Sequence, residues 1–250
     1  LLAQRVTVFG KRPFTGIIAS KPPHLQSGEE AKKVPEMDEI FIDTGYSSKE
    51  LESLVSLGDK VRVEGDFLEL RNNRVAGPAL DDRAGVASIL LALEYLKKER
   101  YPSGLTVVFS TQEETGSAGA ATSAYATAAD MAVAVDVSFA YASDAPEHKC
   151  GKMGGGVMIG MSPVLDRRLS NALIAAAKEK NIPYQVEVMS GSTGTNADKI
   201  AVSRSGVRTG VLSIPQKYMH TPVEVVQAED ITSTAALLAE FVLRAGDWNV

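Results

Sequence analysis

Residues 131–136, Met-Ala-Val-Ala-Val-Asp, form an apolar run that ends in an acid. A short apolar run of this kind is typical of a strand buried on both faces of a sheet. Residues 105–111, Leu-Thr-Val-Val-Phe-Ser-Thr, predict a second such strand, and residues 82–98 before it have the apolar spacing of an amphipathic helix. Strands that alternate with helices indicate a layered α/β fold with a mostly parallel sheet.

The alternation continues to the end of the chain. We predict further strands at residues 156–160, 184–188 and 208–214, and helices at residues 117–127, 166–180, 196–203 and 228–245. Residues 78–250 are therefore expected to form an α/β domain with helices on both faces of a mostly parallel sheet.

The first 77 residues have a different rhythm, in which short apolar runs alternate with turn formers such as Pro22-Pro23 and Gly58-Asp59. Short strands with frequent turns predict a small β-rich domain. The runs lie at residues 5–9, 16–19, 40–42, 60–63 and 67–70, with a short helix expected at residues 47–55. We expect two domains, residues 1–77 and residues 78–250.

The composition excludes several classes of protein. With 44% hydrophobic residues and a net charge of −5, the 250-residue chain is neither disordered nor suited to bind nucleic acid through its phosphates. Its apolar stretches are all shorter than the roughly 18 residues of a membrane span. The single cysteine, Cys150, excludes an internal disulfide framework and a cysteine-rich zinc site, and we expect a cytoplasmic protein.

Acids and a histidine gather where the predicted strands end. They are Asp81, Asp82, Glu113, Glu114, Asp136 and His220. Because ligands of open α/β sheets bind beyond the carboxyl ends of the strands, we expect these side chains to meet. Crowded carboxylates raise one another's pKa unless a cation joins them, and zinc, cobalt and manganese accept these ligands. The pattern predicts a divalent metal site, with a shared carboxylate that suits a pair of ions.

Each of these residues also has an ordinary structural interpretation. Asp81 and Asp82 suit the start of a helix, where acids are favoured, and Glu113 and Glu114 suit a solvated loop. Asp136 is harder to explain in this way, because an unpaired charge after an apolar run is expensive to bury. His24 and His148 follow no predicted strand, so we assign them structural roles.

Four motifs at these positions resemble those of the M42 metallo-aminopeptidases, the group of glutamyl and tetrahedral aminopeptidases. The motifs are residues 79–85, 111–116, 135–137 and 218–222, in the family's order and at family-like separations. Residues 17–24 and 41–49 resemble the family's inserted β-barrel domain. The resemblance spans essentially the whole chain. It implies an inserted barrel at residues 1–77 and a zinc-peptidase-like catalytic domain at residues 78–250 that lacks its leading part.

The resemblance also implies a role for each candidate residue. Asp81 would bridge two divalent ions, zinc or cobalt. A cis peptide bond would join it to Asp82, which would be a supporting residue. Asp136 would bind the first ion, and Glu114 and His220 would bind the second. Glu113 would act as the general base. Residues Gly194, Thr195 and Asn196 would shape the substrate pocket, with asparagine at 196 where many members carry aspartate.

The chain departs from the family at the first ion, which normally takes a further histidine from a His-x-Asp segment ahead of the inserted domain. These 250 residues contain no such segment, and the chain opens at Leu1 within the inserted domain. The first site would have only Asp81 and Asp136 as protein ligands. We therefore expect it to bind its ion weakly or to be vacant.

The main hypothesis is an aminopeptidase that releases N-terminal residues from short peptides, using water activated by two metal ions. One alternative is a fragment that binds peptide without turnover, and another is an amidohydrolase for acylated amino acids. A glycoside hydrolase with paired carboxylates is disfavoured, because adjacent glutamates are poorly placed across a sugar. The resemblance further implies a homo-oligomer, of which the family's dodecamer is an example.

Overall fold

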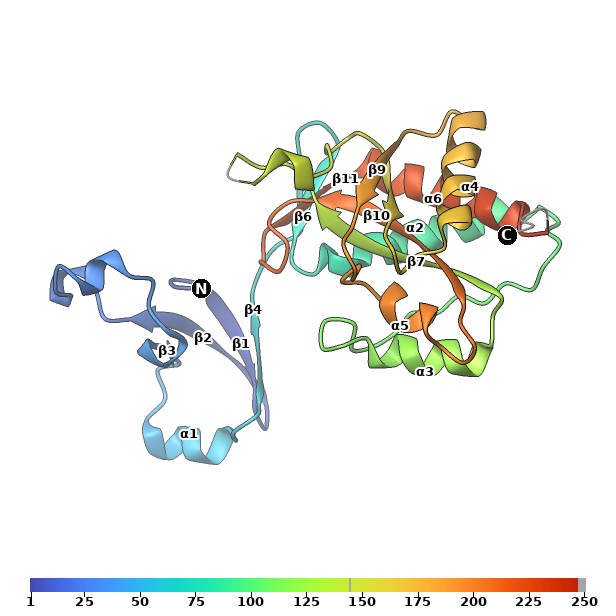
Figure 1. Ribbon diagram of the computed structural model, residues 1–250. Coiled ribbons are helices and arrows are strands. Elements are labelled where there is room, and N and C mark those ends of the chain that lie inside the picture. Colours follow the sequence, from blue (N-terminus) through green and yellow to red (C-terminus); the bar gives the residue numbers. More distant parts are fainter. Residues whose placement is uncertain (144, 247–250) are drawn as a thin grey trace. The chain divides into compact units, whose positions relative to one another are not determined.

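The computed structural model describes residues 1–143 and 145–246, except for the side chain of Ala31. The chain divides into two compact units, Leu1–Asp66 and Phe67–Val250 (Figure 1). The first unit holds a small antiparallel sheet, and the second holds the layered α/β structure that carries every predicted site residue. We describe each unit by itself.

The sheet of the first unit has the strand order β3-β2-β1-β4. Its strands are β1 (Arg5–Phe9), β2 (Pro13–Ser20), β3 (Ile40–Asp43) and β4 (Lys60–Val63), and its helix is α1 (Ser48–Leu54). Val6, Val8 and Ile18 form the buried core of this unit. All pairings are antiparallel, and β3 and β4 lie at opposite edges. The described residues thus form an open sheet instead of the expected barrel, because no ladder joins its two edge strands.

The central sheet of the second unit has the order β7-β10-β8-β9. Its strands are β7 (Met131–Phe139), β10 (Arg208–Gln216), β8 (Val157–Met161) and β9 (Tyr184–Val188). The pairs β7–β10 and β8–β9 are parallel, whereas β10 and β8 are antiparallel. Two of the three pairs are thus parallel, as expected for a mostly parallel sheet, and the antiparallel pair β10–β8 makes the sheet mixed. Parallel neighbours need a crossover connection, and α4 (Arg167–Glu179) supplies one between β8 and β9.

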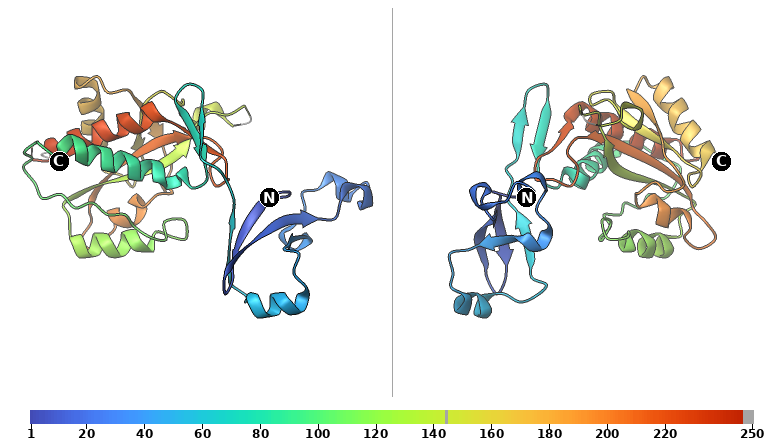
Figure 2. Two further views of the ribbon diagram at one scale, coloured as in Figure 1. Left: turned by 180° about the vertical axis from the view of Figure 1, so that it is seen from behind. Right: turned by 60° about the vertical axis from the view of Figure 1, so that its left-hand side comes forward.

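Helices pack on both faces of this sheet (Figures 1 and 2). One face carries α4 together with α2 (Leu80–Leu96) and α6 (Ala228–Leu243), around a core that includes Leu169, Leu212 and Leu237. The other face carries α5 (Ala197–Ala201), which packs with α3 (Ala118–Thr127). None of the helices that the structure describes has the length and apolar character that crossing a bilayer requires.

A third sheet was not predicted from the sequence. It has the order β11-β6-β5, and its strands are β5 (Leu68–Leu70), β6 (Arg74–Gly77) and β11 (Glu224–Gln227). β6 leads into the start of α2, and β11 follows the loop that holds His220. Because Glu224 pairs with Gly77, this sheet ties together the two segments that deliver site residues.

The strand expected at residues 105–111 is wrong: this segment has no regular secondary structure. Its apolar side chains Leu105, Val108 and Phe109 are exposed. A strand needs a neighbour for its backbone hydrogen bonds, and in the described part of the chain no strand pairs with this segment or with the outer edge of β7. The two face a common cavity of about 920 Å³, which side chains of α2 also line.

Candidate metal centre

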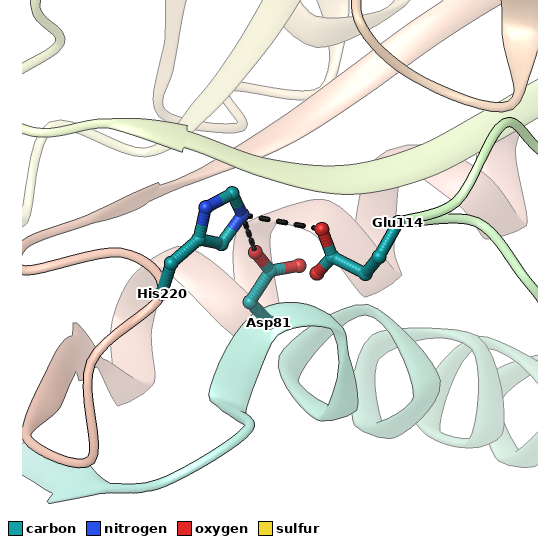
Figure 3. A group of neighbouring side chains, drawn as sticks. All are labelled: Asp81, Glu114 and His220. Atoms are coloured by element: carbon teal, nitrogen blue, oxygen red, sulfur yellow. Dashed lines mark ion pairs between the residues drawn. The ribbon is translucent and has the colours of Figure 1, made fainter. Parts of the chain in front are cut away.

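Three side chains from distant parts of the sequence meet in one cluster, Asp81, Glu114 and His220 (Figure 3). The His220 Nε2 atom lies 3.3 Å from Asp81 Oδ2 and 3.2 Å from Glu114 Oε2. One ligand atom of each residue lies within 4.8 Å of the others. Two carboxylates and one imidazole within this range form a donor set that fits a single divalent transition-metal ion.

Local backbone conformation brings these residues together. Asp81 and Asp82 open α2 with non-helical dihedral angles, and the peptide bond between them is cis, as the resemblance implies. His220 lies in the loop between β10 and β11 with a φ of +61°. Glu114 follows the irregular segment at residues 105–111. All three residues therefore come from loops or from a helix end, where backbone geometry can vary most.

Glu224 connects two members of the cluster and was missed by sequence reasoning. Its buried carboxylate accepts a hydrogen bond from the backbone N–H of Asp81 at 3.1 Å and another from that of His220 at 2.9 Å. One side chain on β11 thus fixes the spacing of two ligand backbones. Its sequence context, Glu-Val-Val-Gln at residues 224–227, gives no signal of this role.

The Asp82 side chain turns back onto its own helix and is not part of the cluster. Its Oδ1 atom accepts a hydrogen bond of 2.8 Å from the backbone N–H of Gly85. A Cβ atom at position 85 would lie only 2.2 Å from Asp82 Oδ2, so the glycine leaves space for the carboxylate. Asp82 therefore supports the start of α2 directly beside Asp81.

Asp136 and Glu113 lie near the cluster but outside it. Both residues line the 920 Å³ cavity, together with Asp82 and Asn196. Asp136 is buried, and its Oδ1 atom accepts a hydrogen bond of 2.9 Å from the N–H of Val137. The structure thus brings three of the five expected catalytic and metal-binding residues into contact, with Asp136 and Glu113 beside them.

Burial and mutual repulsion disfavour the charged forms of these acids. Burial, and after it repulsion by the Asp136 carboxylate, raises the pKa of Asp82 to about 9. Burial likewise raises the pKa of Asp136 to about 8, and Glu113 adds to the shift. For Asp81, burial and the Glu114 carboxylate raise the pKa to about 6. A bound cation would reverse these shifts, because it stabilises the ionised carboxylates. The group as a whole therefore fits a divalent cation.

The metal-free chain is expected to lose stability as the pH rises. In the unfolded chain Asp136 ionises near its ordinary pKa of 3.8, whereas in the folded chain it keeps its proton up to about pH 8. The folded state then binds more protons than the unfolded state between these values, so the free energy of unfolding falls with increasing pH. A shift of one pKa unit corresponds to about 1.4 kcal/mol, so the free energy of unfolding should fall by a few kcal/mol over this pH range.

Thermal unfolding of chelator-treated protein across this pH range measures the effect. Asp136→Asn should make the fall of the Tm with pH less steep, with Asp82 accounting for the remaining slope, and added zinc should raise the Tm most at the alkaline end. A metal-free profile that rises steadily from acid to neutral pH would contradict the raised pKa of Asp136.

The loop proposed to shape the substrate pocket is held by Asp198 of α5. Its carboxylate accepts hydrogen bonds from Ser192 Oγ at 2.6 Å, from Thr193 N–H at 2.9 Å and from Gly194 N–H at 3.2 Å. Beside this loop, the Asn196 Nδ2 atom donates to Ser110 Oγ at 3.0 Å, and the buried Asn196 Oδ1 atom has no protein partner among the described residues.

The comparisons with known proteins agree on one family. The model of the M42 glutamyl aminopeptidases matches residues 1–237. A lysyl aminopeptidase from Pyrococcus furiosus is 32% identical over 244 residues, which are 95% of this chain and 69% of the relative. The solved aminopeptidase APDkam598 from the archaeon Desulfurococcus kamchatkensis is 37% identical with a TM-score of 0.90, over 99% of this chain and 71% of that chain.

A further solved relative, PhTET1-12s, is described as a dodecamer in the asymmetric unit. It is 29% identical with a TM-score of 0.80, over 97% of this chain and 72% of that chain. The three relatives are thus matched over nearly all of this chain and over about seven tenths of their own lengths. By family and by homologues, this chain is a member of the M42 glutamyl aminopeptidases, a group of peptidases and therefore of hydrolases.

Proposed function

We propose that the chain is a metal-dependent aminopeptidase that releases N-terminal residues from short peptides. The observation that carries the proposal is the cluster of Asp81, Glu114 and His220, with Glu113 outside it but electrostatically coupled to Glu114 and His220. Asp81, Glu114 and His220 would hold one divalent ion, zinc or cobalt. Asp81 and Asp136 would provide ligands for the other ion of the pair. Bound ions of this kind act as Lewis acids that polarise the scissile carbonyl and acidify water.

The chain's own residues supply the proton transfers. Glu113 would take the proton of the attacking water as general base and then donate it to the leaving amine. Its half-buried position raises its pKa, and the neighbouring Glu114 carboxylate raises it further, which favours a group that takes up a proton. Asp82 would keep the start of α2 in place beside Asp81.

Substrate selection and assembly belong to the same proposal. Gly194, Thr195 and Asn196 would shape the substrate pocket, since Asn196 and Glu113 line the same cavity. Residues 1–77 would form the inserted domain and residues 78–250 the catalytic domain. A homo-oligomer is proposed because PhTET1-12s is dodecameric. One family name specifies glutamate and one relative's name specifies lysine, so family membership leaves the preferred N-terminal residue open.

Metal removal and restoration test the proposal. Chelator treatment should abolish hydrolysis of aminoacyl p-nitroanilides, and one to two equivalents of zinc or cobalt should restore it. N-acetylated substrates serve as the control and should stay intact, because an aminopeptidase needs a free amine. Hydrolysis that survives complete metal removal would overturn the proposed mechanism.

One observation supports the alternative that the chain binds peptides without hydrolysing them: Asp136 lies outside the cluster. Metal titration separates the two candidates. Ion binding and peptide binding without any hydrolysis, under all metal loadings, would favour the non-catalytic function.

A further inference from the structure

His220 lies in a short loop, residues 218–224, that joins β10 to β11. Lys217 and Val225 close the base of this loop, because each donates its backbone N–H to the carbonyl oxygen of the other at 3.0 Å. Inside the loop Met219 packs against a buried apolar cluster, whereas Thr221 is exposed and the side chain of His220 is 65% exposed. Packing therefore does little to hold His220, and the shape of the loop depends mainly on hydrogen bonds.

Two residues of the loop adopt the left-handed backbone conformation that favours glycine. Tyr218 has a φ of +59°, and His220 has a φ of +61°. This conformation is unfavourable for a residue with a side chain, and it persists only where the surrounding contacts enforce it. The loop therefore needs specific contacts on both sides of His220 to keep its shape.

The hydroxyl group of Thr221 provides such contacts. It donates a hydrogen bond of 2.6 Å to the carbonyl oxygen of Tyr218 and accepts one of 3.3 Å from the backbone N–H of Val223. The first partner precedes His220 by two residues, and the second follows it by three. One side chain next to the metal-binding histidine thus joins the backbone before it to the backbone after it.

Thr221 and Glu224 act on different parts of the geometry. The Glu224 carboxylate accepts the backbone N–H groups of Asp81 and His220, so it sets where the loop stands relative to the start of α2. Both hydrogen bonds of Thr221 stay within the loop, so they set its internal shape and with it the direction of the imidazole. That direction matters because His220 Nε2 lies only 3.2 Å and 3.3 Å from the two clustered carboxylates (Figure 3).

We propose that Thr221 is a positioning residue of the metal centre. Its hydroxyl group holds the loop in the shape that turns the His220 imidazole toward the two carboxylates. The following residue, Pro222, favours an extended backbone at Thr221, so the hydroxyl group has few other positions to adopt. The inference rests on the proposed metal-dependent function and adds a residue that acts through His220.

Thr221→Val tests this, because it removes the hydroxyl group and keeps the size and branching of the side chain. By titration calorimetry the variant should bind zinc about 10-fold more weakly than the wild type, as the loss of hydrogen bonds that orient a ligand implies. The visible absorption spectrum of the Co²⁺-loaded protein should also change, because it reports the coordination geometry. Thr221→Ser restores the hydroxyl group and should recover most of the zinc affinity and the wild-type spectrum.

Thr232→Val is the matched control. Thr232 is also exposed, and its hydroxyl group donates to the carbonyl oxygen of Glu229 at 2.9 Å, within α6. This variant should keep the zinc affinity and the Co²⁺ spectrum of the wild type. Unchanged zinc affinity and spectrum in Thr221→Val, or no recovery in Thr221→Ser, would overturn the role of Thr221 and leave the metal-dependent function standing. Absence of zinc binding by the wild type would overturn both proposals.

Discussion

Glu113→Gln is expected to reduce kcat by about 10²–10⁴-fold and to leave zinc binding to the cluster unchanged. The Asp81, Glu114 and His220 ligand atoms lie together, whereas Glu113 lies outside their group. The glutamine side chain has nearly the same size but cannot accept and return a proton. The change therefore separates proton transfer from ion binding. Stopped-flow or steady-state kinetics together with zinc titration calorimetry would measure both effects.

Glu114→Gln is the matched control for this experiment, because it changes the adjacent residue in the same way. Glu114 Oε2 lies 3.2 Å from His220 Nε2, so its loss should weaken zinc binding itself. Near-normal turnover by Glu113→Gln would refute the general-base assignment. Equal losses of zinc affinity in both variants would also refute it, since Glu113 would then act as a ligand.

The second large effect is expected at Glu224. Glu224→Gln should reduce zinc affinity by about 10–100-fold, although its side chain is not one of the three clustered donors. The carboxylate accepts two backbone N–H groups, from Asp81 and from His220. A glutamine amide accepts through one atom only and turns an N–H group toward the other donor, which costs about 1–3 kcal/mol of stability.

Asp230→Asn is the matched control for Glu224→Gln. Asp230 is fully buried and also accepts two backbone N–H groups, from Gly154 at 2.7 Å and from Gly156 at 2.8 Å. Its replacement should lower the Tm by a similar amount but leave the zinc affinity of the folded protein unchanged. If both variants lost zinc affinity to the same degree, the effect of Glu224 would be general destabilisation and not positioning.

The sequence predicted most of the helices and strands because their signals are local. The helix at Arg167–Glu179, for example, begins after Asp166, whose side chain accepts the N–H groups of Arg168 and Leu169. Local signals did not reveal strand direction, because the antiparallel pairing of β10 with β8 depends on the connection between them. They also predicted a strand at residues 105–111 that does not form, because an apolar run alone does not provide a neighbouring strand for hydrogen bonding.

The sequence placed Asp81 and His220 together because strand and helix ends converge in α/β sheets. Glu114 joins them as expected, although the strand predicted before it does not form. The cis peptide bond at Asp81 came from the family resemblance. Glu224 was not predictable in this way. It is a single acid next to short apolar residues, and its importance arises from its hydrogen bond to the backbone of Asp81, which is distant in the sequence, together with that to His220.

The outer edge of β7 and the irregular segment at residues 105–111 also have a consequence for the behaviour of the molecule in concentrated solution. Both lack a ladder partner among the described residues, and Leu105, Val108 and Phe109 are exposed beside them. Open edges next to apolar side chains invite pairing with strands of other molecules. This side of the second unit is therefore an aggregation hazard. A lysine at position 108 would protect it by adding a charge that opposes intermolecular pairing.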